Sequence, residues 1–124
     1  MAKDQAKKIL VVDDDPTIVK LLEGVLKAKG FEVLTASDGL DAMVQVKKSN
    51  PDLIILDIMM PEINGYEVCS NLKFNDRYKE IPIIILTSRD QELDTRISQM
   101  MGIDYMHKPL KRDDLLTKIE KIFK

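Results

Sequence analysis

Short apolar runs alternate along the chain with longer segments in which apolar residues recur every three or four positions. An unbroken apolar run predicts a strand that is buried on both faces, as in parallel sheets. The longer segments predict helices that bury one side. The predicted strands are residues 9–12, 31–36, 53–56, 81–86 and 103–107. The predicted helices are residues 18–29, 39–49, 66–74, 92–101 and 113–123.

This regular alternation predicts the fold class. Five strands alternating with five helices are typical of an α/β domain whose parallel sheet is covered on both faces. The crossovers between strands should be right-handed. The sequence contains no internal repeat, low-complexity tract or linker. We therefore expect one domain over residues 1–124, with its core at about 8–123.

Several helix ends are marked by residues that favour them. Asp15 and Asp38 precede helical patterns and are of a type that caps helix N-termini. Gly30 follows the first helical pattern and favours its termination. Either Asp113 or Asp114 is expected to open the last helix, which runs toward the C-terminus.

Composition narrows the possible functions. The formal net charge is −2, which gives no electrostatic reason to bind DNA or a membrane directly. No apolar stretch approaches the roughly 20 residues that span a bilayer, and the N-terminus lacks the apolar region of a signal peptide. The single cysteine, Cys69, cannot form an internal disulfide. A cytoplasmic protein without nucleic-acid or membrane partners is the expectation.

Polar side chains follow four of the predicted strands. Asp13 and Asp14 follow the first strand and Asp57 follows the third, while Thr87 and Lys108 follow the fourth and fifth. The carboxyl ends of parallel strands open into the crevice where ligands bind in such sheets. Crowded carboxylates repel one another, and oxygen ligands with room for water suit Mg²⁺. The set predicts Mg²⁺-assisted phosphoryl transfer, with an aspartate available as the nucleophile.

Four dispersed motifs resemble the receiver domain of two-component response regulators, the CheY-like family. They are Val-Val-Asp-Asp, Leu-Asp-Ile-Met-Met-Pro, Leu-Thr-Ser and His-Lys-Pro-Leu, which begin at residues 11, 56, 86 and 107. The resemblance covers essentially the whole chain. It implies a flavodoxin-like, doubly wound, five-stranded parallel sheet of order 2-1-3-4-5 with five helices.

The resemblance also implies the roles of individual residues. Asp57 would accept a phosphoryl group from a phosphohistidine of a sensor histidine kinase or a histidine phosphotransfer protein. Asp14 would bind Mg²⁺ directly, and Asp13 would act mainly through water. The backbone carbonyl of Met59 and the carboxylate of Asp57 would complete the protein's share of the metal site.

Further residues would convert phosphorylation into a signal. Thr87 would hydrogen-bond the phosphoryl group, Lys108 would form an ion pair with it, and Tyr105 would rotate as the switch aromatic. The response would appear at the face formed by the fourth helix, fifth strand and fifth helix, which binds a downstream protein target. Met59 and Arg89 would flank the water that hydrolyses the phosphate. The chain is expected to be a monomer or a phosphorylation-dependent dimer.

Other functions remain open from the sequence. A stand-alone receiver that switches a target and a relay intermediate that passes the phosphoryl group onward share the same residues. In a different class, the segment Asp13–Thr17 matches the DxDxT nucleophile motif of haloacid-dehalogenase-like phosphatases. That enzyme would use Asp13 and leave Asp57 without a role. A pseudo-receiver that only binds partners would not need the intact acid pair, Asp57, Thr87 and Lys108.

Overall fold

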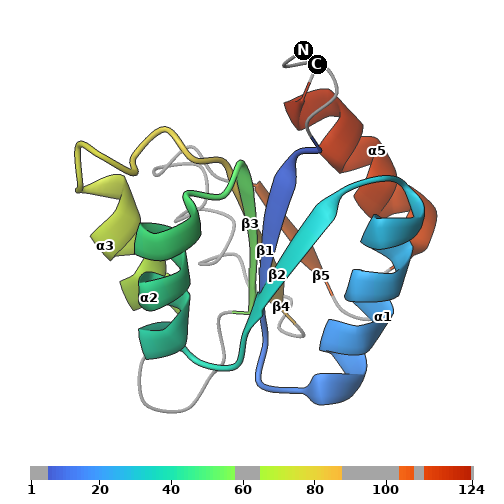
Figure 1. Cartoon of the computed structure of the whole chain (residues 1–124), viewed down its shortest axis with the longest axis horizontal. Helices are drawn as coiled ribbons and strands as arrows, with labels where there is room; N and C mark the ends of the chain where they lie inside the picture. Colours follow the sequence, from blue (N-terminus) through green and yellow to red (C-terminus); the bar gives the residue numbers. More distant parts are fainter. Residues whose placement is uncertain (1–5, 58–64, 88–103, 108–110, 124) are drawn as a thin grey trace.

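A central parallel sheet with helices on both faces forms the fold of the computed structural model (Figure 1). The structure describes residues 6–57, 65–87, 104–107 and 111–123. The strands are β1 (Lys8–Val12), β2 (Glu32–Ala36), β3 (Leu53–Asp57), β4 (Ile83–Thr87) and β5 (Asp104–His107). The helices are α1 (Pro16–Ala28), α2 (Gly39–Ser49), α3 (Gly65–Lys73) and α5 (Arg112–Ile122).

The order of the strands is β2-β1-β3-β4-β5, and every neighbouring pair is parallel. This confirms the predicted sheet and its order. The helix predicted at 92–101 lies outside the described residues. Among the described helices, none has the length and apolar character needed to cross a membrane.

The sheet separates two apolar layers. Helices α1 and α5 cover one face, and α2 and α3 cover the other (Figure 1). Successive side chains of a strand point to opposite faces, so Leu53 and Ile55 of β3 pack in the layer of α1 and α5. Ile54 and Leu56 pack in the layer of α2 and α3. Every residue of β3 is buried, as its unbroken apolar run predicts.

The two predicted N-caps near the carboxyl end of the sheet are confirmed. Asp15 accepts a hydrogen bond from the backbone N–H of Thr17 at 2.9 Å, and Asp38 accepts one from Asp41 at 2.8 Å. Each bond satisfies an amide that has no partner within its own helix. The ends of β1 and β2 are therefore followed by well-anchored helix starts.

The predicted start of the last helix is wrong. Helix α5 begins at Arg112, and its N-cap residue is Lys111, whose side chain makes no capping hydrogen bond. Asp113 and Asp114 lie within the first turn instead. Carboxylates in the first turn are stabilised by the positive end of the helix dipole without being caps. Two adjacent acids therefore mark the region of the helix start but not its first residue.

Two strands begin slightly later than predicted because the preceding turns use their first residues. The N–H of Phe31 donates to the carbonyl of Leu26 at 3.1 Å and closes the end of α1. The N–H of Ile81 donates to the carbonyl of Tyr78 at 3.0 Å, and Pro82 has no N–H to offer the sheet. Hydrophobic character alone does not distinguish these turn residues from the strands that follow.

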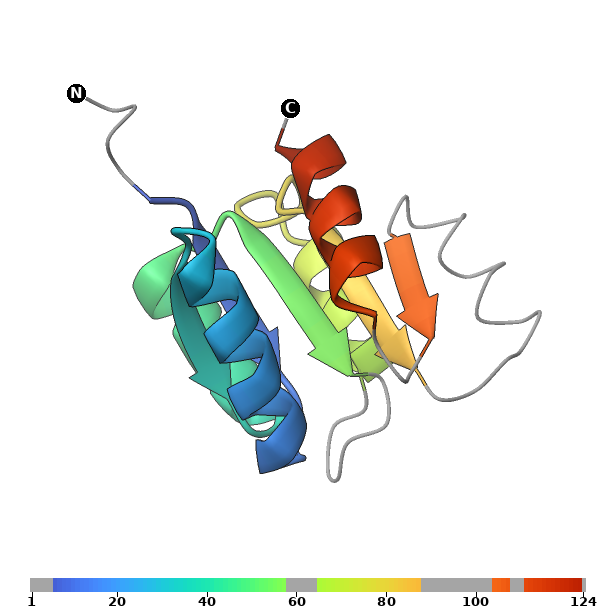
Figure 2. The same cartoon turned by 90° about the vertical axis from the view of Figure 1, so that its right-hand side faces the viewer.

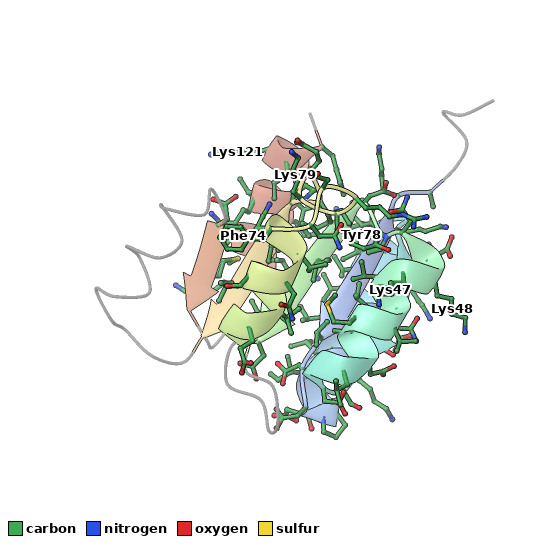
Figure 3. The ribbon with its side chains drawn as sticks, turned by 90° about the vertical axis from the view of Figure 1, so that its left-hand side faces the viewer. Lys47, Lys48, Phe74, Tyr78, Lys79 and Lys121 are labelled. Carbon is green, nitrogen blue, oxygen red and sulfur yellow. The ribbon has the colours of Figure 1, made fainter. Side chains whose placement is uncertain are left out.

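The segment between α3 and β4 lies on the side of the molecule that Figure 3 shows, and contacts to the fold hold it there. Tyr78 is 6% exposed and packs in the layer of α2 and α3, whereas Phe74 is 84% exposed. The ammonium of Lys73 donates to the backbone carbonyls of Lys79 and Ile81, each at 3.1 Å. A buried ring and a lysine with two carbonyl partners thus hold this charged segment in place.

Two glycines of the α1 region should respond to alanine in opposite directions. Gly24 lies inside α1, and an added Cβ there would meet nothing within 4 Å. Gly24→Ala should therefore raise the free energy of unfolding by about 0.5–1 kcal/mol, because alanine loses less backbone entropy in a helix. Gly30 has a φ of 94°, so Gly30→Ala should lower the free energy of unfolding by about 1 kcal/mol or more. Urea unfolding of both variants checks the pair, and a stabilising Gly30→Ala would contradict it.

Candidate functional site

The register of the sheet brings three aspartates to one edge. Val12 of β1 is paired with Leu56 of β3, so the residues that follow, Asp13 and Asp57, lie at the same level. The N–H of Asp13 also donates to the carbonyl of Ala36 at 3.2 Å, which ties it to the end of β2. Figure 2 shows the arrowheads of β3 and β5 at this same, lower end of the sheet. The predicted convergence of the strand ends is thus observed.

The carboxylates of Asp13, Asp14 and Asp57 form a cluster. They each offer a ligand oxygen, and these oxygens lie within 4.8 Å of one another. Asp13 is 1% exposed and Asp57 is 5% exposed, while Asp14 is exposed. Negative charges at this separation repel, and burial of two of them weakens the screening by water. The cluster therefore favours a bound cation.

The donor set fits Mg²⁺. All three ligand atoms are carboxylate oxygens, which hard divalent cations prefer over nitrogen or sulfur. Mg²⁺ usually keeps several waters and takes only one or two carboxylates directly. The exposed position of Asp14 leaves one side of the cluster accessible to water and to an incoming ligand.

The turn after β1 orients the buried Asp13. The backbone N–H of Asp15 donates to Oδ1 of Asp13 at 2.9 Å. Asp15 itself is extended, with φ −94° and ψ 109°, and it is followed by Pro16 at the start of α1. The sequence predicts Asp15 as a cap but does not predict its amide as a partner of Asp13. The signal that could have suggested it is the tendency of aspartate to bond an amide two residues later.

A hollow of about 440 Å³ opens beside the cluster. It lies between the start of α1, the end of β2 and the start of α2. Its lining includes Asp13, Asp14, Pro16, Thr35 and Asp41. Two of the three aspartates of the cluster, Asp13 and Asp14, thus lie at the edge of a surface depression, and Asp14 is the exposed one.

The other predicted site residues are described in part. Asp57 is paired with Leu86 of β4, and Thr87 follows directly as the last residue of that strand. The backbone of Thr87 therefore lies near the level of Asp57 on the neighbouring strand. Tyr105 is in β5, paired with Ile85. Three predicted residues lie outside the described part of the chain: Met59, Arg89 and Lys108.

Cys69 has no place in this site. It is buried in α3, and burial raises the pKa of its thiol from 9.0 to about 12, while the nearby Lys73 ammonium opposes this shift. The folded thiol therefore stays protonated at pH values where the unfolded thiol ionises. Between pH 9 and 12 the unfolded state loses this proton first, so this group makes the folded state less stable as the pH rises.

The chemical reactivity of Cys69 should reflect the raised pKa of its buried thiol. At pH 9, alkylation of the folded protein by iodoacetamide should be more than about a hundredfold slower than alkylation in urea, because the thiolate is the nucleophile. Mass spectrometry of timed samples measures both rates. Equal rates would show that the thiol is accessible and ionised in the folded state.

Known proteins similar to this chain share one family. The family described as response regulator receiver domain matches residues 9–120. Protein PilG of Pseudomonas aeruginosa is 39% identical over 114 residues, which cover 91% of this chain and 84% of that protein. The alkaline phosphatase synthesis transcriptional regulatory protein PhoP of Bacillus subtilis is 40% identical over 119 residues. These cover 95% of this chain but 49% of PhoP, so the chain spans about half the length of that relative.

Solved structures that are similar to this chain point to the same family as its sequence relatives. The chemotaxis protein CheY4 of Vibrio cholerae superimposes with a TM-score of 0.88 at 29% identity, covering 95% of this chain and 99% of that one. A putative response regulator from Chloroflexus aurantiacus gives a TM-score of 0.89 at 33% identity, covering 95% and 98%. The similarity therefore extends through the whole fold, including the strands that carry the aspartates.

Proposed function

Because the chain belongs to the response regulator receiver domain family, we propose that it is a phosphorylation-controlled switch with Asp57 as its phosphoacceptor. Receiver domains accept a phosphoryl group on an aspartate and act as switches rather than as enzymes in the usual sense. The observation that carries the proposal is the cluster of Asp13, Asp14 and Asp57 at the carboxyl ends of β1 and β3. Asp57 is the member of this cluster that ends a fully buried strand.

The proposed reaction transfers a phosphoryl group from a phosphohistidine to Asp57. A carboxylate oxygen of Asp57 forms the new O–P bond as the N–P bond of the donor breaks, and the imidazole leaves and takes a proton from water. A bound Mg²⁺ would neutralise charge on the phosphoryl oxygens and help to orient the phosphoryl group for attack by Asp57. Asp13, Asp14 and Asp57 would hold that ion, with the backbone carbonyl of Met59 as a further ligand.

Residues of β4 and of the segment after β5 complete the proposal. Thr87 would donate a hydrogen bond to one phosphoryl oxygen, and Lys108 would form an ion pair with another. The inward movement of Thr87 would leave room for Tyr105 to rotate and would shift a two-state equilibrium. The affected surface would be the one built from α5, β5 and the helix predicted at 92–101. The backbone position of Thr87, directly after the residue paired with Asp57, supports this arrangement.

Partners and fate of the phosphate belong to the same proposal. Receiver domains interact with histidine kinases or phosphotransfer proteins, and we assign the phosphodonor to this group. The acceptor site would hydrolyse its own phosphate, in the cytoplasm, with Met59 and Arg89 beside the attacking water. The output would be a protein contact. A relay that passes the phosphoryl group onward would use the same site.

Beryllofluoride, which mimics a phosphoryl group on a carboxylate, tests the proposal. With Mg²⁺ and beryllofluoride the melting temperature of the wild type should rise by several degrees, because a ligand that binds only the folded state stabilises it. Asp57→Asn should show no such rise. Asp76→Asn is the matched control, since the side chain of Asp76 is 99% exposed and lies in the segment after α3. Identical responses of wild type and Asp57→Asn would rule out Asp57 as the phosphoacceptor.

A further inference from the structure

Asp15 connects the start of α1 to the buried carboxylate of the cluster. Its side chain accepts the N–H of Thr17 at 2.9 Å, and its own N–H donates to Oδ1 of Asp13 at 2.9 Å. The two hydrogen bonds lie on opposite sides of one residue. Any change in the backbone of Asp15 therefore affects the helix start and the Asp13 carboxylate together.

The capping bond determines where the amide of Asp15 points. An N-cap residue needs an extended backbone, and Asp15 has φ −94° and ψ 109°. The bond to Thr17 holds this conformation, and Pro16 restricts it further because a residue before proline is confined to extended backbone. The amide of Asp15 is thereby kept within hydrogen-bond distance of Asp13.

The orientation of the Asp13 carboxylate matters because this residue is buried, with only 1% of its surface exposed. Water has little access to replace a lost hydrogen bond at this position, so the carboxylate would rotate or repack. Its ligand oxygen lies within 4.8 Å of those of Asp14 and Asp57. A rotation of Asp13 would therefore change the position of one oxygen in a set that must converge on one cation.

We propose that Asp15 is a positioning residue for the Mg²⁺ site, which it serves by holding Asp13 through the turn that its side chain caps. Asp15 is not a member of the carboxylate cluster found among the described residues. Its effect on the cation passes through its backbone amide and Asp13. This role rests on the proposed function, because it needs a cation at the cluster.

Asp38 provides a matched comparison. It also caps a helix that follows a strand of this sheet, and it accepts the N–H of Asp41 at 2.8 Å. The residue that its cap holds, Asp41, is not a member of the cluster. Asparagine caps helices about as well as aspartate, whereas alanine does not cap. At each position the alanine and asparagine variants lose the same charge and differ in the cap.

The experiment titrates MgCl₂ into the wild type and four variants by calorimetry: Asp15→Ala, Asp15→Asn, Asp38→Ala and Asp38→Asn. The dissociation constant for Mg²⁺ should be about tenfold higher in Asp15→Ala than in Asp15→Asn, since outer partners of metal ligands typically change affinity by about this factor. Asp38→Ala and Asp38→Asn should bind Mg²⁺ equally. Thermal unfolding of the same samples should show that both alanine variants lose a similar amount of stability.

The outcomes separate this role from the proposed function. If the two position-15 variants bind Mg²⁺ equally while the wild type binds it well, the positioning role is wrong and the switch is unaffected. An equal loss of affinity on removing either cap would show a general effect of helix stability and would also overturn the positioning role. If the wild type does not bind Mg²⁺ at all, both the positioning role and the metal-dependent switch are wrong.

Discussion

Incubation with acetyl phosphate and Mg²⁺ should add one phosphoryl group to the wild type and none to Asp57→Asn. Acetyl phosphate is a small donor that needs no partner protein, so the reaction tests the acceptor site alone. The amide oxygen of asparagine is a poor nucleophile, and it brings no negative charge to the cation. Intact-protein mass spectrometry at timed intervals gives the phosphorylated fraction directly.

Two controls accompany this prediction. Asp76→Asn should be phosphorylated at the wild-type rate, because the side chain of Asp76 is 99% exposed and lies in the segment between α3 and β4. Chelation of Mg²⁺ should slow the wild type strongly, since the cluster of Asp13, Asp14 and Asp57 would then lack its compensating charge. Phosphorylation of Asp57→Asn at the wild-type rate would contradict the assignment.

The largest loss of stability is expected in the layer beneath α2 and α3. Leu10 of β1 is fully buried there. Leu10→Ala should lower the free energy of unfolding by about 2–5 kcal/mol, because it removes buried apolar atoms and leaves a cavity that the sheet cannot close. Urea or thermal unfolding measures the change.

Leu40→Ala is the matched control for this loss. Leu40 lies in α2 and is 56% exposed, so the same chemical change removes little buried surface. The free energy of unfolding should change by no more than about 0.5 kcal/mol. Similar losses in the two variants would mean that Leu10 is not in a closely packed core.

The sheet and the position of the site follow from local features of the sequence. The unbroken apolar run before Asp57 predicts a buried central strand, and each residue of β3 is buried. Asp15 and Asp38 cap the helices that they precede. The strand order depended on the resemblance to a family, because periodicity does not say which strands are neighbours.

Features that depend on backbone hydrogen bonds were harder to predict. The amide of Asp15 that orients Asp13 is a backbone group, and every residue except proline carries one. The sequence does not distinguish Lys73 from a surface lysine, yet its ammonium donates hydrogen bonds to two backbone carbonyls of the segment after α3. Burial lowers the pKa of this ammonium, and the nearby Cys69 and Glu80 side chains oppose this shift. Such roles are set by how the chain folds back on itself.

Locating the phosphoryl group on the chain decides whether Asp57 is the phosphoacceptor. Borohydride reduces an aspartyl phosphate to homoserine, so treatment of the phosphorylated wild type followed by peptide mass spectrometry identifies the modified residue. Homoserine at position 57 alone is the expected result. Homoserine at position 13 would instead indicate the nucleophile of a haloacid-dehalogenase-like phosphatase and would contradict the assignment of Asp57 as the phosphoacceptor.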